Sequence, residues 1–496
     1  MGDQVWQIIS MTIYLAAMVG IGFYAQKRTS NLDDYMLGGR GLGPFVSALS
    51  AGASDMSGWL MMGLPGALYL SGLVELWIAI GLTVGAWLNW KFVAPRLRSY
   101  TEIAGNSITI PSFFGNRLKD DSRILRIVSG AIILVFFTLY VSSGMVAGGT
   151  FFEASFGVDY AWGMLGIAAV TVLYTLVGGF LAVSWTDVVQ GLMMVVALVM
   201  LPIVGIIHLG GPGELFAQIR EVDPLLLTWF EGGTAIGITS AVAWGLGYVG
   251  MPHILVRFMA LTSAREATTA RRIGIGWMVL SALGAAFTAF VGIAIYRHDE
   301  GALPNPEGVF IALGQMLFHP LIAGFLLAAI LAAIMSTVSS QLLVTSSALV
   351  EDIYHAFTPL KLSASRGVLL GRLGVLAVAI IAAALAWQRN DTILGLVAFA
   401  WAGFGAGFGP TVVLSLYWRK LTTAGAAAGM VVGAVTVFVW KLLLNPLGGI
   451  FELYEILPAF VANLVVAVAV SLATWKPNPE IEQEFDAVVT ATAVSR

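Results

Sequence analysis

Charged residues are scarce in this chain, and cysteine is absent. Of the 496 residues, 11% are charged and 58% are hydrophobic. The absence of cysteine excludes disulfides, thiolate metal sites and cysteine nucleophiles. Soluble domains carry charge on about a quarter of their residues, so a soluble fold of this length would have too few charges to cover its surface. The net charge of −3 offers no basic field for nucleic acid.

The hydrophobic residues fall into segments long enough to cross a bilayer, which takes about 20 residues in a helix. The sequence therefore predicts an all-α polytopic membrane protein with about 13 transmembrane helices. The expected spans are roughly 5–25, 44–70, 73–95, 127–150, 160–179, 187–209, 234–253, 273–297, 308–350, 367–388, 392–417, 423–443 and 452–475. The segment 308–350 is too long for one span, and we expect an interfacial piece around Val309–Phe318 before a crossing helix that starts near Pro320.

Basic residues concentrate in alternate loops. With the N-terminus outside, 21 of the 25 lysines and arginines lie on the cytoplasmic side, and only Arg220, Arg297, Arg389 and Lys441 lie outside. Cytoplasmic loops carry the excess of positive charge, so we expect an outside N-terminus and a cytoplasmic C-terminus. The polar segment 476–496 is expected to form a mobile cytoplasmic tail.

An acidic residue interrupts the second predicted span. Asp55 lies in "SAGASDMSGW", residues 50–59, among serines and glycines that weaken a helix. Ionisable groups at membrane depth are costly and usually functional. An unwound segment here would free main-chain carbonyls for a small hard cation, with Asp55 supplying negative charge. The alternative is that Asp55 bonds to its neighbours and only stabilises a break in the helix.

Hydroxyl residues gather on one face of a later helix. In "ILAAIMSTVSSQLLVTSS", residues 330–347, Ser336 and Thr337 follow Ala333 by three and four positions, about one turn, and so lie on the same face of the helix. Two hydroxyls and the Ala333 carbonyl would give three neutral oxygen ligands. The alternative is ordinary bonding of these hydroxyls to their own helix or to a neighbouring one.

A third segment combines aromatic rings with helix-breaking residues. In "AWGLGYVGMPHIL", residues 243–255, Trp244, Tyr248 and Pro252 recur every fourth position, and glycines between them weaken the helix. The rings would form an apolar box for a small solute, and a broken helix would offer backbone groups and a dipole end to a carboxylate or amine. The alternative is an interfacial aromatic belt.

The two interrupted segments, 44–70 and 234–253, each open a group of five spans. Five spans separate their starts, so the two groups have opposite orientations and form an inverted repeat, and broken helices in corresponding positions indicate a binding site at the midplane. We divide the chain into a first span with its loop (1–43), a first repeat (44–210), an extracellular loop (211–233), a second repeat (234–418), two C-terminal spans (419–475) and a tail (476–496).

Extended runs of sequence resemble the sodium/solute symporter family. They include "DDYMLGGR" at 33–40, "SAGASDMSGW" at 50–59, "GGFLAVSWTD" at 178–187 and "AAIMSTVSSQLLV" at 332–344. The resemblance is greatest to bacterial members that carry proline. It implies a LeuT-type fold with one extra helix before and two after a ten-helix core. It also implies uptake of L-proline driven by Na+ in the bacterial inner membrane, with no obligatory protein partner.

The resemblance also implies residue roles. Sodium would be held by the carbonyls of Ala53, Met56 and Ala333 and the hydroxyls of Ser336 and Thr337. The solute would contact Ser57, Tyr140, Trp244, Tyr248 and Pro252. Asp55 would serve sodium coupling, Asp187 the inward ion path, and Arg40 a cytoplasmic gate. Met251 and Ser340 depart from the family pattern, where glutamine and cysteine are expected, and Met251 leaves the orientation of the solute less secure.

Other functions stay open at this point. The same fold would also suit another small solute, or protons in place of sodium. A sensor or a channel is less expected, and saturable, concentrative uptake would separate a transporter from a channel. We expect no enzymatic activity, because the sequence shows no nucleophile–base pair and no metal constellation.

Overall fold

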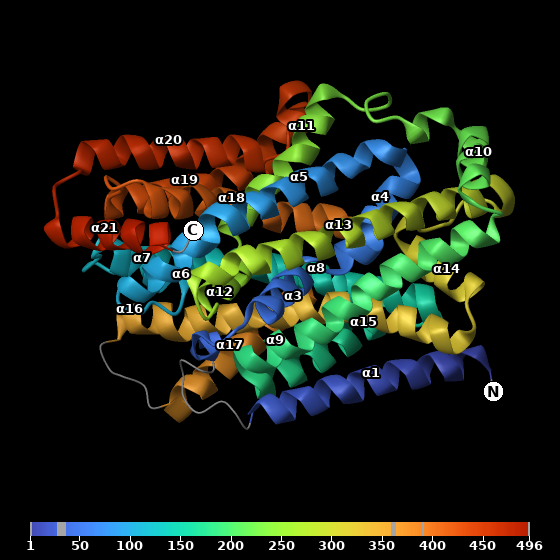
Figure 1. Cartoon of the computed structure of the whole chain (residues 1–496), viewed down its shortest axis with the longest axis horizontal. Helices are drawn as coiled ribbons and strands as arrows, with labels where there is room; N and C mark the ends of the chain where they lie inside the picture. Colours follow the sequence, from blue (N-terminus) through green and yellow to red (C-terminus); the bar gives the residue numbers. More distant parts are fainter. Residues whose placement is uncertain (1, 27–35, 359–363, 389–390, 495–496) are drawn as a thin grey trace.

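The computed structural model describes residues 2–26, 36–358, 364–388 and 391–494, and these residues are almost entirely helical (Figure 1). The predicted all-α class is confirmed. The α-helices are α1 (Asp3–Gln26), α3 (Pro44–Asp55), α4 (Leu64–Ser71), α5 (Leu76–Leu88), α6 (Ala94–Ile103), α7 (Ile110–Leu118), α8 (Ile124–Phe156), α9 (Tyr160–His208), α10 (Pro212–Val222), α11 (Ala235–Ala243), α12 (Pro252–Met259), α13 (Ala267–Gly292), α14 (Val309–Leu317), α15 (Pro320–Ser347), α16 (His355–Phe357), α17 (Ala364–Ala386), α18 (Ile393–Tyr417), α19 (Thr423–Val439), α20 (Ile456–Thr474) and α21 (Pro479–Val494). The short α14 before α15 covers nearly the residues of the expected interfacial piece, and its interfacial position stays a prediction.

The number of membrane spans, by length and apolarity, is 10 within the described residues, or 11 if one bent pair counts as a single span. Two stretches separate this number from the predicted 13. Trp59–Ile103 counts once although the chain turns at Gly72, where φ is 77°, and Tyr160–Leu173 is a shorter apolar helix. The figure of 13 therefore stays a prediction. The predicted spans 160–179 and 187–209 both lie in α9, whose two helical parts meet at a kink at Gly179 (φ 63°), and residues 180–186 are helical as well.

Two helices are broken at the positions that the sequence predicts. α3 ends at Asp55, and the chain resumes as a π-helical turn over Trp59–Gly63 before α4. α11 ends at Ala243 and a 3₁₀ segment, Trp244–Gly250, leads to α12 with a bend of 47°. Pro252 stands at the start of α12, where its missing N–H costs no helical bond.

The broken helices occupy the middle of the bundle. α3 packs against α9, α12, α13 and α15, and the 3₁₀ segment Trp244–Gly250 packs against α5 and α18. In Figure 1, α1 runs along one edge of the bundle and α19 with α20 along the opposite edge. The residues of both breaks are thus enclosed by other helices, which supply partners for backbone groups that leave the helical pattern.

The expected mobile tail is a wrong prediction. Residues Pro479–Val494 form α21, which packs on α6 (Figure 1). Lys119 Nζ lies 2.8 Å from Glu480 Oε1 and 2.5 Å from Glu484 Oε1, and Phe485 and Val488 are buried. The acidic residues that made the segment look solvated pair with basic residues of the bundle, while two apolar residues three positions apart form a buried face.

Candidate functional site

Oxygen atoms of α3 and α15 meet where α3 ends. The Ala53 carbonyl accepts hydrogen bonds from Ser336 Oγ at 2.8 Å and from Thr337 Oγ1 at 3.5 Å. Ser336 Oγ also lies 3.1 Å from the Ala333 carbonyl oxygen. All four residues are at most 1% exposed. The structure thus brings together Ala53, Ala333, Ser336 and Thr337, four of the five predicted sodium ligands, although Ala53 and Ser336 are 283 residues apart.

The break explains why the Ala53 carbonyl is available. In a continuous helix it would accept from the N–H of Ser57, but that N–H bonds instead to the Asp55 carbonyl at 2.9 Å. The Met56 N–H still bonds to the Gly52 carbonyl at 2.9 Å, and Met56 caps α3. No hydrogen bond within the described ranges links the Met56 carbonyl to α15, so its role as a fifth ligand stays a prediction.

Asp55 connects the two broken helices. The Tyr248 hydroxyl donates a hydrogen bond to Asp55 Oδ2, and the two residues are 3% and 4% exposed. The other carboxylate oxygen, Oδ1, is buried without a hydrogen-bond partner among the residues that the structure describes. Asp55, Met56 and Tyr248 border a narrow cavity that Trp90 and Trp277 help to enclose. An unpaired buried carboxylate oxygen is costly, and the coupling role of Asp55 stays a prediction.

Aromatic rings gather near the break that follows Asp55. The ring centroids of Trp244 and Trp59 are 6.3 Å apart, and Ser57 Oγ accepts from the Trp59 N–H at 3.4 Å. Tyr140 is buried near Asp55, and its hydroxyl has no hydrogen-bond partner among the residues that the structure describes. Ser57, Tyr140 and Tyr248 therefore lie around Asp55, and Trp244 joins this group through Trp59.

Pro252 differs from the other four predicted solute residues. It borders a separate cavity beside Phe180, Val256 and Ser347. Since it begins α12, its direct effect is on the shape of the break rather than on the aromatic cluster.

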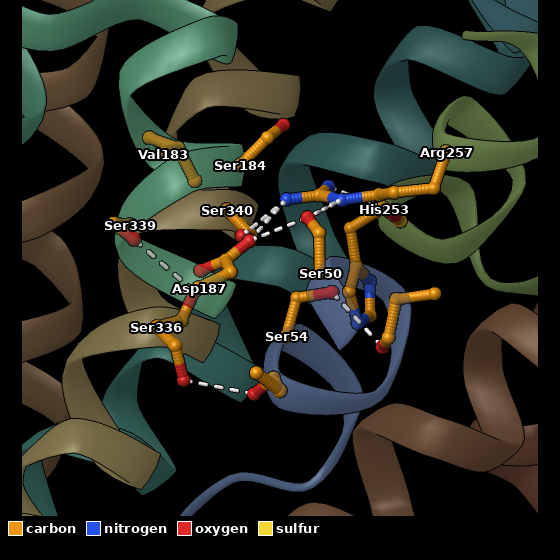
Figure 2. Close-up of polar contacts among 12 residues, drawn as sticks. Ser50, Ser54, Val183, Ser184, Asp187, His253, Arg257, Ser336, Ser339 and Ser340 are labelled. Carbon is orange, nitrogen blue, oxygen red and sulfur yellow. Dashed lines mark hydrogen bonds and ion pairs between the residues drawn. The ribbon is translucent and has the colours of Figure 1, made fainter. Parts of the chain in front are cut away.

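Asp187 lies in a buried polar network one step from the oxygen cluster (Figure 2). Its Oδ2 atom accepts from Ser50 Oγ at 2.7 Å and from Arg257 Nη2 at 3.1 Å. Arg257 also donates to Ser340 Oγ at 2.7 Å and to the His253 carbonyl at 2.7 Å. Asp187 and Arg257 are both 0% exposed. The network joins α3, α9, α12 and α15, the same helices that enclose the oxygen cluster.

Sequence reasoning missed Arg257. It placed this residue in a cytoplasmic loop, whereas Arg257 belongs to α12 and is fully buried. The available signal was local, since Arg257 interrupts the apolar run "PHILVRFM". Its partner Asp187 is 70 residues away, and sequence spacing alone does not bring the two together.

Arg40 fastens three segments at one end of the bundle. Its guanidinium donates to Thr101 Oγ1 at 3.1 Å, Asn106 Oδ1 at 3.1 Å, the Ser107 carbonyl at 2.9 Å and the Met259 carbonyl at 2.8 Å. A backbone bond from the Leu42 N–H to the Ala260 carbonyl, at 3.0 Å, lies beside it. Arg40 thus ties the entry to α3 to the α6–α7 connection and to the end of α12.

Broken helices from two halves of a bundle, meeting at a buried polar centre, define the architecture of a secondary transporter. The chain belongs to the sodium:solute symporter family, whose family model matches residues 35–433. The predicted family is therefore confirmed, and its members are transporters and not enzymes.

Curated relatives match nearly end to end. The high-affinity proline transporter PutP of Bacillus subtilis is 58% identical over 470 residues, covering 95% of this chain and 98% of that protein. The osmoregulated proline transporter OpuE of the same organism is 54% identical, covering 95% of each chain. A sodium/proline symporter of Staphylococcus aureus is 52% identical over 494 residues, covering 98% of this chain and 96% of that protein.

Solved structures confirm the predicted LeuT-type fold. A Na+-coupled sialic acid symporter in a substrate-bound, outward-open state superposes with a TM-score of 0.79 at 20% identity, covering 95% of this chain and 98% of that chain. MhsT in complex with L-phenylalanine superposes with a TM-score of 0.55 at 14% identity, covering 86% of this chain and 98% of that chain.

Proposed function

We propose that this chain couples the inward flow of sodium to the uptake of L-proline by alternating access. Relatives at 52–58% identity, described as proline transporters and as sodium/proline symporters, support this solute and this ion. The observation that carries the mechanism is the bond between the Ala53 carbonyl and Ser336 Oγ at 2.8 Å, because it joins the first broken helix to the third helix of the second repeat.

The oxygen cluster suits a sodium ion. Hard cations bind oxygen ligands, and two ligands of one ion at about 2.4 Å each lie roughly 3 to 3.5 Å apart. The Ala53 carbonyl oxygen lies 2.8 Å from Ser336 Oγ, slightly closer than this range, and 3.5 Å from Thr337 Oγ1. A small rotation of the two hydroxyls turns their lone pairs toward one point, where the ion replaces their hydrogen bonds to the carbonyl. Met56 would complete the set as α3 adjusts.

Sodium binding at this point would link the two repeats and favour the outward-open state. An ion that binds the outward-open and inward-open states equally does not change the equilibrium between them. The cluster must therefore open or lose ligands when the site faces inward. An ion entering down −100 mV releases about 2.3 kcal/mol, and a tenfold gradient adds about 1.4 kcal/mol. Together these support accumulation of about 500-fold for one ion per solute.

The solute would lie between the aromatic rings beside Asp55. Trp244 and Tyr248 would offer apolar faces on the second broken helix, and Ser57 and Tyr140, which are also buried, would face them from the first repeat. A compact ring such as that of proline suits a small box of this kind. Pro252 would act through the bend that it imposes on the segment.

Asp187 and Arg40 would serve the inward side of the cycle. Asp187 lies next to the oxygen cluster in Figure 2 and is held by Arg257, and Arg40 closes the bundle end where α6, α7 and α12 meet. We assign this end to the cytoplasm, with the N-terminus outside and the C-terminus inside, in the inner membrane of a bacterium. Lys119, Arg126 and Arg419 gather there with α21, as expected of a cytoplasmic face. The division into repeats 44–210 and 234–418 belongs to the same proposal.

Counterflow of labelled proline in purified proteoliposomes tests this function. Exchange that requires sodium on the same side as proline supports the proposed function. Uptake of other amino acids and sugars, and uptake driven by a proton gradient in place of sodium, would identify another solute or ion. Asp55→Asn is expected to abolish sodium-dependent uptake, and Trp244→Ala to weaken proline binding without loss of protein. Normal coupled uptake by Asp55→Asn would return that acid to a structural role.

A further inference from the structure

Trp401 contacts the 3₁₀ segment Trp244–Gly250 at Trp244, Gly247 and Tyr248. It lies on α18, is 1% exposed, and belongs to no residue set implied by the sequence. Its indole N–H donates to the Trp244 carbonyl at 2.7 Å. Its ring stacks on that of Trp244 with centroids 6.4 Å apart and meets that of Tyr248 edge-on at 5.1 Å.

The indole also fits against a bare stretch of backbone. A Cβ added to Gly247 would lie 1.9 Å from Trp401 Nε1. Only glycine leaves room for the indole at this point, so the 3₁₀ segment Trp244–Gly250 and the Trp401 ring are shaped to each other. Gly250 approaches the same helix closely, since a Cβ there would lie 2.3 Å from the Phe404 carbonyl oxygen.

The carbonyls of the segment are occupied by side chains from both flanking helices. Trp401 of α18 donates a hydrogen bond to the Trp244 carbonyl, and Asn89 Nδ2 donates one to the Tyr248 carbonyl at 2.8 Å from the other side. The expectation that the break offers free backbone groups to a ligand is therefore wrong for these two carbonyls. What the segment presents to Asp55 is the Tyr248 hydroxyl, through the bond between them.

We propose that Trp401 is a positioning residue for the solute site, which holds Trp244–Gly250 in its bent form and so sets the angle of the Trp244 and Tyr248 rings. This role rests on the proposed solute site. Loss of the indole N–H leaves a buried carbonyl without a donor, and the segment then relaxes toward other angles. Because the solute binds only the original ring angle, its apparent affinity falls with the fraction of molecules that keep this angle.

Two variants separate this role from a general packing role. Trp401→Phe keeps an aromatic ring but removes the donor. Trp77→Phe is the matched control, because Trp77 Nε1 also donates to a tryptophan carbonyl, that of Trp229 at 2.9 Å, in a partly exposed loop contact away from Asp55. We expect Trp401→Phe to raise the KM for proline by about tenfold with little change in kcat per folded molecule. Trp77→Phe should leave both constants unchanged.

Thiol labelling provides a readout that does not depend on proline. The chain has no cysteine, so Ala243→Cys places a single thiol, 6% exposed in the parent residue, next to Trp244. In sodium-free detergent solution, Trp401→Phe is expected to speed its labelling by a water-soluble maleimide several-fold, and Trp77→Phe is not. Monodisperse elution in gel filtration shows that each variant is folded.

The two readouts distinguish the failures. If the parent protein exchanges no proline but labelling responds to Trp401→Phe, the proposed solute is wrong and the positioning of the segment stands. If labelling and KM are both unchanged in folded Trp401→Phe protein, the positioning role is overturned while the proposed function survives. Equal changes with Trp401→Phe and Trp77→Phe also overturn it, since the effect is then not specific to the break.

Discussion

Removing one partner of the buried Asp187–Arg257 pair is expected to harm the protein more than removing both. Both side chains are 0% exposed, and Arg257 Nη2 lies 3.1 Å from Asp187 Oδ2. Asp187→Asn keeps the shape and the acceptor for Ser50 but leaves the guanidinium without a counter-charge. Breaking a buried pair in this way costs about 3–5 kcal/mol.

The double variant Asp187→Asn/Arg257→Met removes both charges and most of that cost. Replacing a buried pair by uncharged groups of similar volume is often neutral. Arg257 also donates to Ser50 Oγ, to Ser340 Oγ and to the His253 carbonyl, and losing these bonds costs about 1 kcal/mol each. The double variant should therefore recover up to about 2 kcal/mol of the stability that Asp187→Asn loses.

The assay is the fraction of protein that stays monodisperse in gel filtration after heating in detergent. The exposed pair Arg419–Asp486, with side chains 52% and 56% exposed, gives a matched control. Asp486→Asn is expected to change stability by less than about 1 kcal/mol. A double variant as unstable as Asp187→Asn, or an equal loss from Asp486→Asn, would refute the argument that the buried charge dominates.

Two further predictions concern the proposed cytoplasmic face. Arg40→Lys should open this face almost as much as Arg40→Ala, because one ammonium group cannot bond to all four acceptors of the guanidinium. The opening is measured as faster labelling of a Ser347→Cys thiol. A labelling rate in Arg40→Lys as slow as with Arg40 present would contradict this prediction. Burial alone would lower the pKa of the Lys119 amine, but hydrogen bonds and charge from Glu480 and Glu484 raise it above the usual 10.5. The contribution of Lys119 to the docking of α21 should therefore persist at neutral pH and be lost as pH rises through that raised pKa. Lys119→Gln should expose a Val488→Cys thiol at pH 7.5, with Thr490→Cys as an exposed control; an unchanged labelling rate would show that the ion pairs do not hold the helix.

The breaks in the helices were predictable because their causes are local. Glycine, serine and proline weaken a helix wherever they fall, and both breaks lie at the expected residues, after Asp55 and between Trp244 and Gly250. The face shared by Ala333, Ser336 and Thr337 also follows from helical spacing alone. These features predicted the residues of the oxygen cluster. Its contact with Ala53 could not be predicted from them, because that contact depends on how the two repeats pack together.

The remaining features depend on long-range contacts. From its position in the sequence, Arg257 is assigned to a loop, but in the structure it pairs with Asp187 of α9. Trp401 lies in a stretch of small residues typical of helix packing, and only the structure shows that its indole bonds to the Trp244 carbonyl. α21 reads as a polar tail until Lys119 neutralises its acids. In each case a charge or polar group has a partner far away in sequence, and single-residue propensities carry no information about that partner.

The most direct test of the account is the sodium dependence of proline binding after Ser336→Ala/Thr337→Ala. The matched control is Ser339→Ala/Thr345→Ala, which removes two buried hydroxyls of α15. Among the residues that the structure describes, their hydrogen bonds stay within that helix, to the carbonyls of Ser336 and Gln341. The account predicts that the first pair raises the sodium concentration for half-maximal binding by about tenfold or more, with proline affinity recovered at saturating sodium, and that the control leaves it unchanged. An unaltered sodium requirement in folded Ser336→Ala/Thr337→Ala protein would contradict the claim that α3 and α15 together hold the ion.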